Sequence, residues 1–275
     1  MATPRWRLFA GVTLVVLVTV LALSRATAEA LSGEDTPEAD PGHRTGTRGP
    51  VAPPDTPATD ERGAEEREHP VARSRRAPST DPGSDLLVSA ALSQALVGGL
   101  LVGLAWYAQV PARALGLAAP GNALLPGLAL GVALYGANEG GVWIADRFGI
   151  ESDEALRELL APETARGWIV LLFVVLPLVA VVEELLFRGA LVGALAAGFP
   201  VSPWPLAVLS SVAFGLGHGL QGLGGVVVTG ALGFALAAAF VLTGSLWVVV
   251  VAHYVVNALE FLVHEGPPAG LEHRR

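Results

Sequence analysis

The chain has 275 residues, of which 52% are hydrophobic and only 15% charged, a composition typical of a polytopic membrane protein. It has no cysteine, which excludes disulfides, thiol nucleophiles and thiolate metal sites. The formal net charge of -8 argues against nucleic acid as a partner. We therefore expect an all-α bundle of membrane-spanning helices, with membrane lipid around it.

The N-terminal part divides into an apolar segment and a polar one. Residues 1–30 contain an apolar run that follows Arg5 and Arg7 and ends before small residues, which fits a signal peptide and an uncleaved anchor helix equally well. Residues 31–85 are rich in Pro, Gly and charged residues, with an excess of acids. Such a segment buries too little apolar area to offset the entropy lost on ordering, so it is predicted to be a disordered acidic linker.

Residues 86–263 are predicted to be the membrane core, followed by a C-terminal tail at 264–275. Six apolar segments are each long enough to cross a hydrocarbon layer of roughly 30 Å. They run from Leu86 to Gln109, Ala123 to Ala145, Trp168 to Gly198, Pro203 to Gln221, Leu223 to Leu242 and Ser245 to Val263. Residues 146–167 alternate apolar and charged side chains, which predicts a short amphipathic helix at the headgroups. Short connections after the third segment predict antiparallel neighbours.

Two carboxylates and a guanidinium interrupt the third apolar segment. Ionisable groups at that depth cost about 2.5 to 3.5 kcal/mol each, so they are seldom present without a partner or a function. Glu184 and Arg188 are four residues apart and share a helix face, which allows an ion pair. Glu183 lies about 100° around the helix from Glu184, so its side chain can face a neighbour other than Arg188.

Other polar side chains fall in later apolar segments. His218 lies near the end of the fourth segment. His253 and Asn257 project from one face of the sixth segment. Because the chain must turn at residues 199–203, Glu183 and His218 are predicted to lie at one level, near the membrane side opposite that turn. His253 is expected more than one helical turn from this level unless tilt or a bend at Gly244 closes the gap.

Three further polar residues lie near helix ends. Asn138 and Glu139 are close to the end of the second segment, and Glu260 follows His253 by seven residues, near the exit to water. We interpret these residues as helix-end groups rather than as chemical ones.

The intramembrane set predicts hydrolysis of an amide or ester. A carboxylate paired with an imidazole away from bulk water can act as a general base on a water molecule. A second imidazole and a carboxamide on one face offer N–H donors to a tetrahedral oxyanion. No Ser or Cys is placed with a base at comparable spacing, so a covalent nucleophile is not indicated.

Three short motifs carry a family resemblance. They are Glu183-Glu184 followed by Arg188, Phe214 with His218, and His253 with Asn257. Together they resemble the signature of the CPBP intramembrane proteases, also called Abi, which include type II CAAX prenyl endopeptidases and bacteriocin-processing or self-immunity proteins. The resemblance covers Trp168 to about Val263, and no motif position departs from the pattern.

The resemblance implies a role for each motif residue. Glu183 and His218 would activate the attacking water. His253 and Asn257 would stabilise the oxyanion. Glu184 and Arg188, with Phe214, would brace the site.

Cofactor, function and orientation stay open at this point. We favour a mechanism that requires no cofactor, but Glu183, His218 and His253 could instead hold zinc, although their spacing is not that of zincins. The leading function is an intramembrane endopeptidase acting on membrane-associated or prenylated proteins at the plasma membrane, with CAAX-type processing as one form. A non-catalytic scaffold or bacteriocin-immunity protein is the alternative, and an ion or proton transporter is a third, although no repeated halves are visible. Arginines in the loops give conflicting cues for the orientation of the core.

Overall fold

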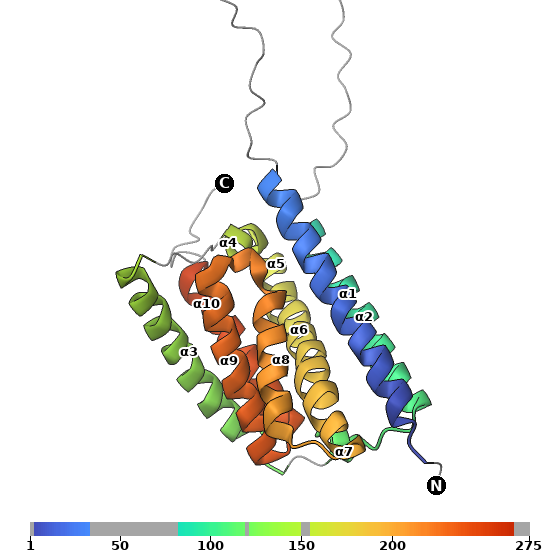
Figure 1. Cartoon of the computed structure of the whole chain (residues 1–275). Helices are drawn as coiled ribbons and strands as arrows, with labels where there is room; N and C mark the ends of the chain where they lie inside the picture. Colours follow the sequence, from blue (N-terminus) through green and yellow to red (C-terminus); the bar gives the residue numbers. More distant parts are fainter. Residues whose placement is uncertain (1–2, 34–81, 119–120, 150–154, 267–275) are drawn as a thin grey trace, which may run out of the picture.

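The computed structural model describes residues 3–33, 82–118, 121–149 and 155–266, and the regular structure in these residues is helical (Figure 1). The predicted all-α fold is confirmed. Most of the predicted acidic linker at 31–85 and of the tail at 264–275 lies outside the described residues.

Five helical stretches are long and apolar enough to cross a bilayer. They are Trp6–Thr27, Asp85–Tyr107, Ala165–Gly198, Gly219–Thr243 and Leu246–His264. The protein is therefore an integral multi-pass membrane protein. By length and apolar composition, four of the six predicted core spans qualify, and the predicted second and fourth spans fall short for two different reasons.

The predicted fourth span is too short, and the predicted second span is too polar in its second half. Helix α8 (Pro203–Gly217) has 15 residues, a length of roughly 22 Å against a hydrocarbon layer of roughly 30 Å. The predicted fourth span is shorter than expected because its helix stops before His218. Helix α3 (Leu124–Arg147) has the length, but Asn138 and Glu139 dilute the apolar character of its second half.

The third predicted span is one continuous helical rod with two π-helical stretches. It consists of α5 (Ala165–Val170), η2 (Leu171–Val175), α6 (Leu176–Glu184), η3 (Leu185–Ala194) and α7 (Leu195–Gly198). The first π-helical stretch lies directly before Pro177, which has no backbone N–H to donate. The second begins at the residue after Glu184. Short π-helical stretches occur frequently at functional sites.

The remaining helices follow as antiparallel neighbours, as predicted. After α8 the chain makes the 3₁₀ turn η4 (Gly219–Gln221) and continues as α9 (Gly222–Thr243) and α10 (Leu246–His264). Gly244 caps α9 in the left-handed region at φ 63°, which lets α10 start two residues later. Figure 1 shows α6, α8, α9 and α10 packed together, with α3 outside them.

Glycines allow α3 to approach α10 closely. A Cβ atom on Gly127 would lie 2.6 Å from Cβ of Val251, and one on Gly131 would lie 2.6 Å from Cβ of Val255. Small residues at helix interfaces permit this approach in lipid. As a result, the polar half of α3 is held against the end of α10.

The N-terminal helix α1 (Trp6–Gly33) lies beside α2 (Pro82–Tyr107) and against α8 (Figure 1). Phe9 and Thr13 on α1 are buried, and the hydroxyl of Ser24 donates to the carbonyl oxygen of Gly217 at 2.6 Å. These contacts attach α1 to the core, and the signal-peptide and anchor interpretations of residues 1–30 both stay predictions.

Two short elements lie at opposite ends of the bundle. The 3₁₀ turn η1 (Ala112–Leu115) packs on η3, where a Cβ atom on Gly193 would lie 2.3 Å from the Ala114 oxygen. The carbonyl oxygen of Gly116 also accepts from the backbone N–H of Leu246 at 2.9 Å. At the other end, α4 (Ala155–Leu160) occupies the region where a short amphipathic helix was predicted.

Candidate active site

A buried ion pair lies at the centre of the bundle. Nη1 of Arg188 is 2.7 Å from Oε1 of Glu184, and the two side chains are 1% and 0% exposed. Nη2 of Arg188 donates to the carbonyl oxygen of Gly233 at 2.8 Å. The guanidinium carbon also lies 4.6 Å from the ring centroid of Phe214. The ion pair predicted from the four-residue spacing is therefore present, and it connects η3 to α9.

The same carboxylate oxygen holds His253. Oε1 of Glu184 is 2.7 Å from Nδ1 of His253, and a carboxylate can only accept, so Nδ1 carries the proton. The other ring nitrogen, Nε2, lies 3.8 Å from Oε2 of Glu183. The contact between Glu184 and His253 was not predicted from the sequence, because 69 positions separate the two residues.

His218 is fixed by the helix that precedes it. Its Nδ1 lies 2.8 Å from the carbonyl oxygen of Phe214, an oxygen that can only accept. Nδ1 must therefore carry hydrogen, and Nε2 of the neutral ring is left with a lone pair. The rings of His218 and Phe214 lie 4.6 Å apart between centroids, and Phe214 meets His253 edge to face at 6.0 Å. One phenyl ring thus lies against both imidazoles.

A cavity of about 300 Å³ is lined by Glu183, His218, His253 and Asn257. The structure therefore brings the residues predicted to be catalytic to one cavity. His253 and His218 both lie against the ring of Phe214 and line the same cavity, so the expected gap between them does not keep them apart. Oε2 of Glu183 is buried and has no hydrogen-bond partner among the described residues.

The backbone beneath the site is held by a hydroxyl from α8. Oγ of Ser210 donates to the carbonyl oxygen of Phe187 at 2.6 Å. Phe187 lies in the π-helical stretch η3, one residue before Arg188. Ser210 therefore stabilises the backbone that carries the ion pair.

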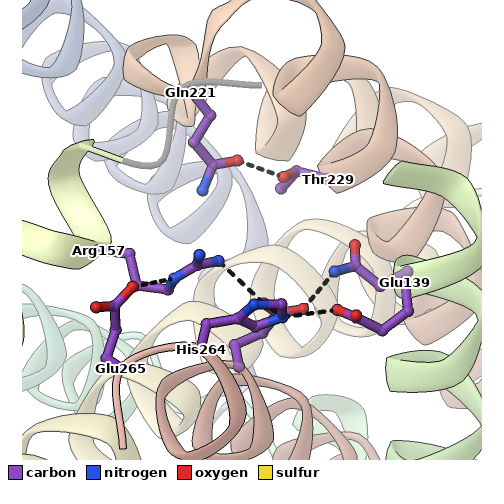
Figure 2. Close-up of polar contacts among 8 residues, drawn as sticks. Glu139, Arg157, Gln221, Thr229, His264 and Glu265 are labelled. Atoms are coloured by element: carbon purple, nitrogen blue, oxygen red, sulfur yellow. Dashed lines mark hydrogen bonds and ion pairs between the residues drawn. The ribbon is translucent and has the colours of Figure 1, made fainter. Parts of the chain in front are cut away.

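A second polar group lies at the outer end of the cavity (Figure 2). Arg157 on α4 binds Glu265 at 3.0 Å and Glu260 at 3.3 Å, so it connects α4 to the end of α10. His264 lies 3.0 Å from Glu139, which connects α10 to α3. Asn138 also donates to Glu260. Helix-end positions were predicted for Asn138, Glu139 and Glu260, but not their contacts across three helices.

These residues form the mouth of the cavity. The side chains of Glu139 and His264 are 39% and 30% exposed, against 18% for Glu183 and 7% for His253 deeper inside. Glu139 and His264 are therefore the more accessible part of this group, whereas Glu260, at 16%, is as buried as Glu183. The mouth lies at the face of the bundle opposite the turn between α7 and α8, the level predicted from the hairpin.

A zinc site at Glu183, His218 and His253 was the alternative to a metal-free centre. Within the described ranges, the one trio of carboxylate and histidine ligand atoms lying within 4.8 Å of one another is Glu139, Glu260 and His264. One ring nitrogen on each proposed histidine is bound to a protein oxygen, which leaves Nε2 as the atom that would bind zinc. The ligand atoms of Glu183, His218 and His253 do not all lie within 4.8 Å of one another. The zinc alternative stays a prediction, and no step below passes through a metal.

Sequence reasoning missed several polar residues in the wall of the cavity, among them Gln221 and Thr229. Gln221 was treated as the end of the fourth span, yet it lines the cavity, and its Oε1 accepts from the hydroxyl of Thr229 at 2.7 Å. The available signal was the four-residue spacing of Gln221, Gly225, Thr229 and Gly233, which aligns the N-cap residue Gln221 with one face of α9.

Comparison with protein families gives one match. Residues 165–259 match the family described as type II CAAX prenyl endopeptidase Rce1-like. The matched segment is about a third of the chain, runs from α5 into α10 and contains every residue predicted for the site. No curated protein and no solved structure matches the chain.

Proposed function

Because residues 165–259 belong to the Rce1-like family of type II CAAX prenyl endopeptidases, we propose that the protein is an endopeptidase acting in or beside the bilayer. The observation that carries the proposal is the Glu183 carboxylate. One of its oxygens is buried without a partner, yet the side chain borders a cavity that also contains His218. A buried acceptor that lacks a hydrogen bond lowers stability, so a water molecule or a substrate group is expected to donate a hydrogen bond to this oxygen.

The attacking group in this proposal is a water molecule held by Glu183 and His218. Because Nδ1 of His218 is used by the Phe214 carbonyl, Nε2 is the acceptor that faces a water proton. Glu183 takes one proton from the water as its oxygen attacks the peptide carbonyl carbon. Both groups accept, so they leave the water lone pair free for the attack.

Asn257 and His253 then act on the tetrahedral intermediate. The Asn257 carboxamide donates an N–H to the oxyanion, and Nε2 of His253 also donates when the ring carries both protons. The proton taken by Glu183 passes to the leaving nitrogen as the C–N bond breaks. The products are a carboxylate and an amine, and no covalent enzyme intermediate forms.

The roles of Glu184 and Arg188 in this reaction are to hold the ring of His253. The carboxylate accepts from Nδ1 of His253, and the guanidinium fixes that carboxylate. Phe214 restricts both imidazoles by contact with their rings. These three residues position the site without touching the reacting atoms.

The proposed substrate is a membrane-associated polypeptide, and a prenylated C-terminus of the CAAX type fits best. Apolar side chains form much of the cavity wall, including Val179, Leu232, Leu236 and Val256. An apolar wall beside a polar reacting centre suits a peptide held near a lipid chain. We propose the plasma membrane as the location.

Glu183→Gln tests this function. Purified wild type and variant in nanodiscs are incubated with prenylated and plain peptides, and the products are identified by mass spectrometry. The expected result is cleavage by the wild type and a loss of at least about a hundredfold in the variant, within the range typical of a general base. Glu158→Gln, an exposed carboxylate on α4, is the matched control.

The same preparation separates the competing interpretations. Biological activity that survives in Glu183→Gln while the protein stays folded would support a scaffold or immunity protein. Ion flux in proteoliposomes without peptidase activity would support a transporter. Metal content and chelator sensitivity of the active sample test the zinc alternative.

A further inference from the structure

We propose that Gln221 is a substrate-binding residue of this cavity. In this proposal its carboxamide nitrogen donates to a carbonyl-type oxygen of the bound peptide main chain. The inference rests on the proposed endopeptidase function and adds a binding contact beyond the predicted catalytic set.

The orientation of the Gln221 carboxamide is determined by Thr229. The Thr229 hydroxyl donates to Oε1 at 2.7 Å, which leaves the nitrogen on the opposite side of the amide. Figure 2 shows this nitrogen turned away from Thr229, toward the side on which Arg157 lies. Within the described part of the chain, the nitrogen has no hydrogen-bond partner. Two oriented N–H donors therefore face the cavity.

Gly225 provides the space in which the side chain lies. A Cβ atom at position 225 would be 2.3 Å from Cβ of Gln221 and 3.2 Å from its Oε1. Any larger residue would displace the glutamine. Gly225 and Thr229 lie on successive turns at one face of α9, Gln221 is the N-cap residue of that helix, and all three line the cavity.

The position of Gln221 along the chain sets its distance from the reacting centre. The 3₁₀ turn η4 connects it to His218, and the backbone N–H of Gln221 donates to the His218 carbonyl oxygen at 3.0 Å. Three residues of 3₁₀ helix rise about 6 Å. An extended peptide advances about 3.3 Å per residue, so in this proposal the contact falls on a residue near the scissile bond and not on the scissile carbonyl itself.

The chemistry of the wall explains what this donor recognises. Apolar side chains such as Val228 and Leu232 line the same cavity, and a buried N–H without an acceptor is costly. A main-chain carbonyl oxygen of an extended peptide is the acceptor that every peptide substrate provides. The contact therefore fixes the register of the peptide without selecting a side chain.

Four variants test the proposal by separating KM from kcat. Gln221→Glu keeps the shape and the acceptor for Thr229 but replaces N–H donors with an oxygen that repels a carbonyl. Gln221→Ala removes the contact, Thr229→Val releases the carboxamide, and Gly225→Ala displaces it. Loss of one neutral hydrogen bond predicts a rise in KM of about two- to tenfold for the last three variants, and more for Gln221→Glu, with kcat nearly unchanged.

Two matched controls use the same substitutions elsewhere. Thr243→Val removes a hydroxyl from the far end of α9, where it donates to Ala239. Gly103→Ala adds a methyl group on α2 where no atom lies within 4 Å. Both are expected to retain the KM of the wild type. A free-acid and an amidated peptide distinguish a terminal carboxylate from an internal carbonyl as the acceptor.

The result that overturns the proposal is a KM within twofold of wild type for Gln221→Ala and Thr229→Val. If one variant does not fold, Gly225→Ala and the remaining replacements still provide the test. Failure of the proposed function is a different result, because then the wild type does not cleave or Glu183→Gln cleaves equally well.

Discussion

Replacing Arg188 with Met tests whether the buried ion pair holds the site together. The substitution keeps much of the side-chain volume but leaves the Glu184 carboxylate, which is 0% exposed, without its cation. It also removes the donor to the Gly233 carbonyl oxygen. Breaking one side of a buried ion pair costs about 3 to 5 kcal/mol, because the remaining charge stays buried.

The double variant Glu184→Gln with Arg188→Met predicts a different outcome. It removes both charges, while the Gln carboxamide oxygen can still accept from Nδ1 of His253. Replacing a whole buried pair is often close to neutral for stability. The double variant should therefore recover most of the stability that Arg188→Met loses, and Glu184→Gln alone should be destabilised.

Thermal unfolding in detergent measures these differences. A loss of about 3 kcal/mol lowers Tm by roughly 6–12 °C for a protein of this size. The coupling energy between the two positions follows from the four-variant cycle. If Arg188→Met is no less stable than the double variant, the two charges do not compensate each other and the reasoning is refuted.

Two further variants test the packing around the site. Gly131→Ala should lower stability by about 1 to 3 kcal/mol, because its Cβ would overlap Val255 and push α3 from α10; Gly136→Ala, which meets no atom within 4 Å, should change Tm little. Ser210→Ala should cost about 1 to 2 kcal/mol, because the buried carbonyl of Phe187 loses its donor; Tm unchanged within about 1 °C would contradict it.

Local sequence patterns predicted the order and direction of the helices well. Apolar runs, separated by turns rich in glycine and proline, indicated the membrane helices. The four-residue spacing of Glu184 and Arg188 indicated their ion pair. The end of α8 was wrong because the chain around His218 remains apolar after the helix has stopped. The π-helical stretches were not predicted, since hydropathy does not distinguish π-helix from α-helix.

Contacts between distant residues were the main omission at the site. Nothing near Glu184 in the sequence indicates His253 as its partner, since that contact depends on how α6 packs against α10. The mouth residues were recognised singly as polar groups near helix ends. Their meeting depends on the glycines at 127 and 131, which let the α3 backbone lie against α10.

The place of the cavity's polar end has a consequence for the orientation of the protein in the membrane. Glu139 and His264 line the cavity at one end of the bundle, whereas η1 packs on η3 at the other, so the polar end of the cavity faces one side of the bilayer. A preparation sealed in vesicles with that polar end inward should be latent toward an added water-soluble peptide. Permeabilising the vesicles should allow the enzyme to cleave the added peptide. The ratio of the cleavage rates before and after permeabilisation would then report which fraction of the molecules has this orientation in the bilayer.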